Sequence, residues 1–121
     1  MAHDHRSMRE DRGYLCFPEI DIRLPFSVGM TELLTAKLMP RVVRDAMLFG
    51  RRYDSGAAVA AGLVDAAAGL DTLLPDAVAL ASGLAGKDPV VLQTIKRRTY
   101  AAAIAALRAG GDDLVLTLPA G

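Results

Sequence analysis

Alanine dominates this sequence and limits the kind of core that it can build. Of the 121 residues 21 are alanine, whereas there is no Trp and only three Tyr and three Phe. Alanine-rich helices pack closely, but each buries little apolar area, and burial contributes only ~25 cal/mol per Å². A core of such helices is therefore thin unless a further layer of protein covers it, either from a second copy of the chain or from a partner segment.

Charge and hydropathy exclude several classes of protein. The 14 basic and 14 acidic side chains cancel, whereas a dedicated nucleic-acid-binding domain carries a basic excess, so we expect no nucleic-acid partner. No apolar run approaches the ~20 residues of a membrane span, and we expect no membrane association. The charged residues 1–12 lack the apolar core of a signal peptide. The single Cys16 rules out an internal disulfide, and together these features predict a cytoplasmic globular domain.

The N-terminal quarter predicts one short strand and a loop. Residues 1–12 are a polar lead-in without a clear pattern. The β-prone run over 14–17 predicts a strand, which Pro18 ends because proline cannot donate to a β-ladder. Residues 20–28 alternate apolar and polar side chains but contain Pro25, so we expect an extended loop there.

Two helices are expected next. Apolar side chains at helical spacing predict the first helix from Gly29 onward. They are Met30, Leu33, Leu34 and Leu38. Pro40 ends that helix and begins the second, which stops at Gly50. Its expected inward side chains are Val43, Ala46 and Met47.

A short helix and a strand stub follow. Asp54 or Ser55 is placed to cap a helix over 56–61, and Gly62 to end it in the left-handed conformation. Leu63 and Val64 are then expected to form a stub of strand.

The last half of the chain predicts two longer helices. The first begins at Asp71 as N-cap, carries Pro75 in its first turn and closes at Gly86. Its expected inward face comprises Leu74, Ala77, Val78, Ala81, Leu84 and Ala85. The second has the strongest start signal in the chain, Asp88 followed by Pro89, and is expected to run to Arg108 and stop at Gly110–Gly111.

Two clusters of reactive side chains and the single cysteine are candidate sites. His3, Asp4 and His5 lack a third and fourth metal ligand at suitable spacing, which favours a flexible solvated N-terminus over a metal site. Cys16 lies in an apolar run and is expected in the core rather than as a reactive thiolate.

The second cluster is basic and lies in the last predicted helix. Lys96, Arg97 and Arg98 share a polar face, and a solvated helix face is favoured over an anion-binding site. Gln93 and Tyr100 extend this polar face, opposite Leu92, Ile95, Ala102 and Ala103.

Glu19 is the candidate catalytic residue. It follows Pro18 at the end of the predicted strand, and Ile20 and Ile22 follow it. A carboxylate held against apolar side chains loses hydration and becomes a better proton acceptor, as a general base requires. From these residues alone, an exposed acid in a turn is the alternative.

Two stretches of the chain resemble a known family. Residues 13–30 read G-Y-L-C-F-P-E-I-D-I-R-L-P-F-S-V-G-M, and residues 50–65 read G-R-R-Y-D-S-G-A-A-V-A-A-G-L-V-D. The first resembles the signature of the crotonase (enoyl-CoA hydratase/isomerase) superfamily, in which a strand ends in Pro-Glu and a loop leads into a helix. The second is similar to that family's segment G-x-x-x-x-A-x-x-A-x-x-x-G-L-V-D. The sequence around Glu19 looks most like that of the Δ3-Δ2-enoyl-CoA isomerase branch.

The resemblance implies a fold of the α/β class. It is the C-terminal part of a crotonase-like β-β-α spiral, mostly helical with one or two short strands. A single domain is expected over 1–121, with the last part of the spiral over 1–65 and a helical region over 66–110. The tail over 111–121 is expected to be either an edge strand or disordered.

The resemblance also implies a function. The chain is expected to act on fatty acyl-CoA thioesters, with Glu19 shuttling a proton from C2 to C4 of the acyl chain. Leu24, Pro25 and Phe26 are expected to wall the acyl site, and Lys96 to meet the CoA phosphates. No metal or cofactor is expected, because coenzyme A is part of the substrate. Trimer-type packing in the family implies a homo-oligomer.

One part of the family pattern has no counterpart in these residues. The earlier turns of the spiral supply two backbone N–H groups that stabilise the enolate, and loss of one such donor costs ~2.7–4 kcal/mol. We therefore expect this chain to be incomplete and inactive alone. The alternative is a non-catalytic remnant or interaction module that associates with crotonase-type subunits through its helical face.

Overall fold

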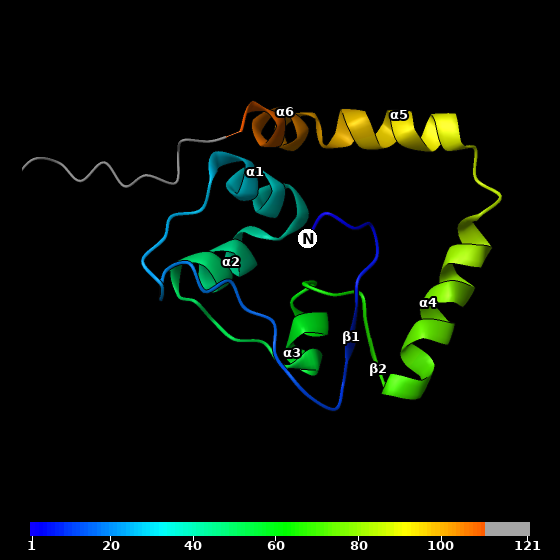
Figure 1. Cartoon of the computed structure of the whole chain (residues 1–121), viewed down its shortest axis with the longest axis horizontal. Helices are drawn as coiled ribbons and strands as arrows, with labels where there is room; N and C mark the ends of the chain where they lie inside the picture. The colour runs from blue at the N-terminus through cyan, green and yellow to red at the C-terminus, as the bar shows by residue number, and fades with distance from the viewer. Residues whose placement is uncertain (111–121) are drawn as a thin grey trace, which may run out of the picture. The chain divides into compact units, whose positions relative to one another are not determined.

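A computed structural model describes residues 1–110, which form two compact units (Figure 1). Unit 1 comprises Met1–Leu15 and Arg52–Thr99. Unit 2 comprises Cys16–Arg51 together with residues 100–110. The tail expected over 111–121 lies outside the described residues. None of the helices in the described part of the chain has the length and apolar character needed to cross a membrane.

A two-stranded parallel sheet lies in unit 1. Strand β1 (Ser7–Arg9) pairs with strand β2 (Ala66–Ala68), with Ser7 opposite Ala66. β1 lies within the lead-in for which the sequence predicts no clear structure. The three alanines of β2 carry no β-branched side chain, so local propensity does not reveal this strand. Its partner lies far away along the chain, and only the tertiary structure pairs them.

Both strands predicted from the sequence are wrong in position. Over 14–17 only Leu15 is paired, in an antiparallel bridge with Tyr53 that has two backbone hydrogen bonds of 2.8 and 2.9 Å. Asp54 begins the next helix directly after Tyr53, so the ladder cannot continue. The half-buried Cys16 follows this bridge and is not part of a strand.

The strand stub predicted at 63–64 is instead the end of a helix. The Leu63 and Val64 N–H groups donate to the Ala58 carbonyl, at 2.9 and 3.3 Å, and so close the last turn of α3 (Ser55–Ala60). Both side chains are buried in the core. The predicted cap of α3 is confirmed: the Asp54 carboxylate accepts from the Ala57 N–H at 2.8 Å. Gly62 adopts φ +70°, as expected for a glycine that ends a helix.

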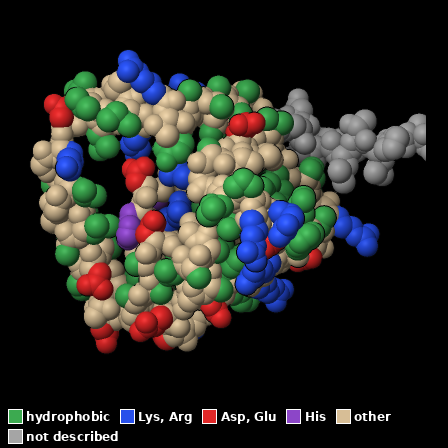
Figure 2. Space-filling model, turned by 180° about the vertical axis from the view of Figure 1, so that it is seen from behind, with side chains coloured by type: hydrophobic (Ala, Val, Ile, Leu, Met, Phe, Trp, Pro, Cys, Tyr) green, Lys and Arg blue, Asp and Glu red, His purple; other side chains and the backbone are tan. Residues whose placement is uncertain are grey.

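Helix α4 (Leu70–Leu84) differs from its prediction in start and burial. Gly69, not Asp71, is the N-cap, and its carbonyl accepts from the N–H groups of Thr72 and Leu73 at 3.2 and 2.9 Å. Pro75 therefore lies inside the helix rather than in its first turn. Within the described chain no side chain of α4 is buried, and hydrophobic side chains along α4 are visible at the surface in Figure 2.

The last predicted helix is two helices. α5 (Pro89–Thr99) begins as predicted, with the Asp88 carboxylate accepting from the Val90 and Val91 N–H groups at 2.8 and 2.9 Å. It ends at Thr99, because Tyr100 leaves the helical conformation with φ −111° and ψ 26°. α6 (Ala101–Ala109) follows and ends at Gly110, as predicted.

Unit 2 is built around α1 (Val28–Lys37), which packs against α6 (Figure 1). Ser27 caps α1 by accepting from the Met30 N–H at 3.1 Å. The second predicted helix is confirmed as α2 (Pro40–Val43), which continues into the π-helical turn η1 (Arg44–Leu48). The buried side chains of this unit include Leu34, Leu38, Ala46, Met47 and Ala103.

The two helices of unit 2 approach each other at a glycine. A Cβ atom added at Gly29 would lie 2.8 Å from Leu107 Cδ2 and 2.9 Å from Leu107 Cα. Contacts under 3 Å to backbone are not tolerated, so only glycine permits this separation of α1 and α6. The short alanine side chains of α6 allow the same close approach of the two helices.

Candidate functional site

Glu19 begins a tight turn in unit 2. The Asp21 and Ile22 N–H groups donate to the Pro18 carbonyl at 2.9 and 3.0 Å, and the Leu24 N–H donates to the Glu19 carbonyl at 3.0 Å. These three bonds fold residues 18–24 back on themselves. The expected extended loop over 20–28 thus begins as a hydrogen-bonded turn, and it brings Glu19 and Leu24 together.

The Glu19 carboxylate is half-buried and has one unused acceptor. Its Oε2 atom is buried and has no hydrogen-bond partner among residues 1–110. A buried acceptor without a partner is destabilising, because it loses water and gains nothing in return. A catalytic role is one of the reasons for which such an atom is kept in a native fold. Glu19 lies in a turn, as the alternative expects, but it is half-buried rather than exposed, and its role as a general base stays a prediction.

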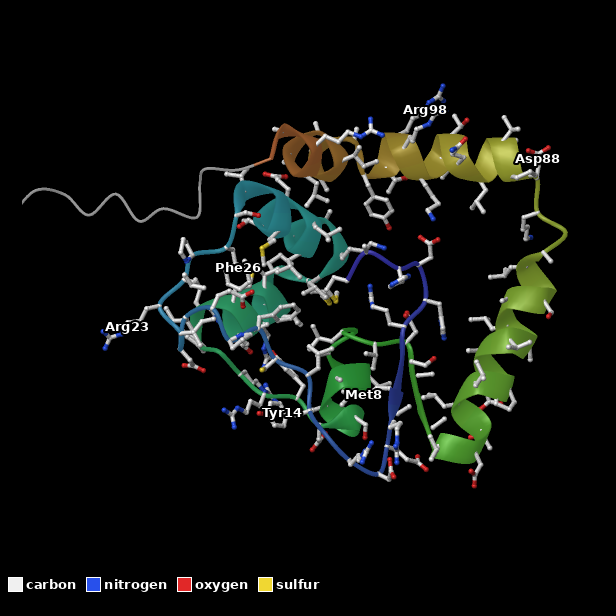
Figure 3. The ribbon with its side chains drawn as sticks, viewed as in Figure 1. Met8, Tyr14, Arg23, Phe26, Asp88 and Arg98 are labelled. Atoms are coloured by element: carbon white, nitrogen blue, oxygen red, sulfur yellow. The ribbon has the colours of Figure 1, made fainter. Side chains whose placement is uncertain are left out.

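The turn also holds a strained backbone. Arg23 has φ +60°, a left-handed conformation that costs a residue with a Cβ atom ~1–2 kcal/mol. Its side chain is exposed and points away from the turn (Figure 3). The bond from Leu24 to Glu19 encloses Arg23, and the three hydrogen bonds of the turn offset the cost of this conformation.

The three predicted substrate-binding residues of the loop are Leu24, which ends this turn, and the two residues that follow it. Leu24 is 52% exposed, whereas Pro25 and Phe26 are half-buried. The Phe26 ring (labelled in Figure 3) lies 6.4 Å from the ring of Phe17, at a tilt of 57°. Because Phe17 precedes Pro18 and Glu19, this aromatic pair joins the two ends of the segment that carries the carboxylate.

Lys96 belongs to unit 1. Its ammonium group forms an ion pair with the Asp4 carboxylate. Arg97 and Arg98 are exposed, and Arg98 points away from α5 in Figure 3. Within unit 2 the Leu24 N–H donates to the Glu19 carbonyl, and the role of Lys96 stays a prediction.

The N-terminal histidine segment is held to unit 1 rather than loose. His5 Nε2 lies 3.1 Å from Ser7 Oγ, and His5 Nδ1 lies 3.8 Å from an oxygen of Asp65. Asp65 also accepts from the Arg6 N–H at 2.8 Å, while its own N–H donates to the Arg6 carbonyl at 2.7 Å. The expectation of a flexible lead-in is therefore wrong. Residues 1–110 contain no group of three or more His, Cys, Asp or Glu side chains placed to hold a metal ion.

One residue near Glu19 was not singled out from the sequence. Gly50, which is predicted only as a helix stop, lies beside the turn, since a Cβ atom added there would be 3.0 Å from Ile20 Cγ2. The available signal was its place as the first glycine of the segment over 50–65, but nothing local connects it to Glu19. The contact depends on how η1 and the turn pack together.

Similarity to known proteins is found in both sequence and structure. No family model matches the sequence. The chain is 34% identical over 105 residues to enoyl-CoA delta isomerase 3 of Arabidopsis thaliana, a match covering 83% of this chain and 44% of the relative. It is 36% identical over 70 residues to the peroxisomal enoyl-CoA delta isomerase 1 of the same plant, covering 57% and 29%.

A solved structure shares the fold. An enoyl-CoA hydratase from Mycobacterium ulcerans Agy99 superposes with a TM-score of 0.79 at 26% identity, covering 88% of this chain and 46% of that one. The chain thus spans less than half the length of these relatives. Its mostly helical architecture with a short parallel sheet matches the later part of their fold. The chain therefore belongs to the crotonase (enoyl-CoA hydratase/isomerase) superfamily and corresponds to the C-terminal part of its fold.

Proposed function

We propose that Glu19 is the acid–base residue of an enoyl-CoA isomerase reaction. The observation that carries this proposal is the buried Oε2 atom of Glu19, which no hydrogen bond engages within residues 1–110. The relatives named as enoyl-CoA delta isomerases support the reaction type.

The chemistry requires one group that both accepts and returns a proton. The Glu19 carboxylate removes a proton from C2 of a 3-enoyl-CoA, and the electron pair delocalises over the dienolate and the thioester oxygen. The resulting carboxylic acid then protonates C4, and the double bond forms between C2 and C3. Atoms and charge balance over the two steps, and Glu19 ends as a carboxylate. A carboxylate with one oxygen that accepts no hydrogen bond is suited to both transfers.

The surroundings of Glu19 suit a fatty acyl chain. Leu24, Pro25 and Phe26 would contact the hydrocarbon, with the Phe17–Phe26 ring pair supporting this wall. Lys96 would meet the CoA phosphates and would then exchange its ion pair with Asp4 for a phosphate. No separate cofactor is invoked, because coenzyme A arrives with the substrate.

We propose further that these 121 residues do not turn over substrate by themselves. They span 44% of the length of enoyl-CoA delta isomerase 3 of Arabidopsis thaliana, and the backbone donors that stabilise the dienolate come, by resemblance to the family, from earlier turns of the spiral. Assembly with like subunits as a homo-oligomer, and a location in the cytoplasm, are proposed with the family function. Two of the relatives are named as peroxisomal, so fluorescence microscopy of the tagged chain distinguishes the two locations.

An isomerisation assay tests the role of Glu19. The assay follows conversion of a 3-enoyl-CoA to its conjugated 2-enoyl isomer by absorbance. The first sample is the 121-residue chain, which we expect to be inactive. The second joins this chain behind the preceding part of the Arabidopsis enoyl-CoA delta isomerase 3, which we expect to be active.

The decisive variants are made in the active chimera. Glu19→Gln keeps the size and hydrogen bonding of the side chain but cannot accept the C2 proton, and general-base catalysis is worth ~10²–10⁴-fold. Glu32→Gln, in α1 of the same unit, changes charge identically and should retain activity. A loss of only a few-fold for Glu19→Gln would contradict the proposal, and so would an equal loss for Glu32→Gln. Robust turnover by the 121-residue chain would contradict its incompleteness.

A further inference from the structure

Gly50 lies under the turn that carries Glu19. It follows η1 and adopts φ +58°. A Cβ atom added there would lie 3.0 Å from Ile20 Cγ2 and 3.1 Å from an Asp21 carboxylate oxygen. Both distances are shorter than ordinary van der Waals contact, so a methyl group at Gly50 would press on Ile20 and Asp21.

The two contacts differ in how easily they would relax. The Asp21 carboxylate is the far end of a side chain and moves by rotation about its own bonds. Ile20 Cγ2 is attached directly to a β-branched carbon, whose χ1 angle is stiff, so its displacement moves the Ile20 backbone. Ile20 is the residue after Glu19, and the peptide bond between them transmits the shift.

The hydrogen bonds of the turn leave little freedom to absorb such a shift. The Pro18 carbonyl accepts from Asp21 and Ile22, and the Glu19 carbonyl accepts from Leu24. Arg23 already occupies a left-handed conformation at φ +60°. A turn constrained at both ends moves as a body, and Glu19 moves with it.

We infer that Gly50 is a positioning residue for Glu19: the absence of a side chain at Gly50 seats Ile20 and thereby sets the place of the Glu19 carboxylate. This inference rests on the proposed function only for its catalytic meaning. The geometric claim stands on the contacts within unit 2 and is measurable without turnover.

Nuclear magnetic resonance of the whole 121-residue chain tests the geometric claim. Glutamate labelled with ¹³C at the carboxyl carbon gives three side-chain signals, because the only glutamates are Glu10, Glu19 and Glu32. Glu19→Gln removes one signal and so assigns it. In Gly50→Ala we expect the Glu19 signal to move while the Glu10 signal stays in place.

Gly62→Ala is the matched control. Gly62 has a similar left-handed conformation, at φ +70°, but a Cβ atom there would meet nothing within 4 Å among the described residues. It therefore carries the same backbone strain without touching the Glu19 turn. If Gly62→Ala moves the Glu19 signal as far as Gly50→Ala does, or if Gly50→Ala leaves that signal unmoved, the inference is wrong.

A rescue variant shows whether the effect passes through Ile20. Ile20→Ala removes Cγ2, the atom nearest to the added methyl group. In the double variant Gly50→Ala with Ile20→Ala we expect the Glu19 signal of the Ile20→Ala single variant, since contacting residues couple in such a cycle. Should Gly50→Ala alone fail to fold, a double variant that folds with this signal supports the inference. A double variant that also fails to fold, or that keeps the displaced signal, overturns it.

Kinetics in the active chimera separate this inference from the proposed function. A displaced base lowers kcat, by up to ~10²-fold for a 1 Å error, and leaves substrate binding unchanged. Gly50→Ala should therefore lower kcat at constant KM. If Glu19→Gln stays active, the proposed function fails while the measured displacement stands. If Glu19→Gln is inactive and Gly50→Ala keeps full kcat, the positioning role alone fails.

Discussion

Helices α1 and α4 show the same kind of sequence pattern with opposite outcomes. Each carries apolar side chains at helical spacing. In α1, which packs against α6, Leu34 is 3% exposed, whereas in α4 Leu74 is 70% exposed. An apolar stripe shows which face a helix can bury. Burial itself depends on whether another element lies opposite that face.

The difference also explains the alanine content. In unit 2 small residues serve close packing, since Gly29 and the alanines of α6 let two helices meet at backbone distance. In unit 1 the alanines of α4 meet no such partner within the described residues. Alanine therefore contributes to stability where another element covers it, as at Ala58 and Ala103, and contributes little where it is exposed.

Truncation of one leucine in each helix should give the largest difference in the free energy of unfolding between the two regions. Leu34→Ala removes a buried side chain and is expected to cost ~2–5 kcal/mol. Leu74→Ala removes an exposed one and should stay within about 0.5 kcal/mol. Urea unfolding followed by circular dichroism measures both. Equal losses would mean that Leu74 is buried in solution, for example by association of copies.

A glycine substitution in each helix should give effects of opposite sign. Gly29→Ala forces a methyl group against Leu107 and is expected to destabilise by ~1–3 kcal/mol, as other overpacked sites do. Gly83→Ala in α4 meets nothing within 4 Å among the described residues. It should stabilise by about 0.5–1 kcal/mol through helix propensity. Thermal unfolding midpoints that shift in the same direction would contradict the α1–α6 geometry.

Substitutions at the starts of α1 and α4 should change the free energy of unfolding by smaller amounts. Ser27→Ala removes the side-chain cap of α1 and is expected to cost ~1 kcal/mol. Asp71→Ala in α4 removes a first-turn charge but no cap, with a loss of about 0.3–1 kcal/mol that salt should reduce. Chemical unfolding at low and high salt distinguishes the two. A salt-independent loss at Asp71 would instead support the N-cap role predicted from the sequence.

The candidate site divides in the same way between local and tertiary causes. The Pro18–Glu19 pair and its apolar neighbours made Glu19 a candidate from the sequence, because the signal is contiguous in the chain, and the resemblance to the family favoured it over an exposed acid. That Glu19 Oε2 is buried without a partner follows only from the folded turn. Gly50, which we infer to position Glu19, lies some thirty residues further along the sequence, and no local pattern relates the two residues.

Caps and stops were determined by the sequence itself. Asp54, Asp88 and Gly62 act within one turn of their own position, so their side-chain or backbone chemistry decides the outcome. The tertiary structure alone decided that Ala66–Ala68 is a strand, because its partner Ser7–Arg9 lies far away along the chain, near the N-terminus. It also decided that the last helix breaks at Tyr100, where no Gly or Pro interrupts the sequence. There Lys37 of α1 lies 4.6 Å from the centre of the Tyr100 ring, and packing against α1 outweighs a propensity that favours an unbroken helix.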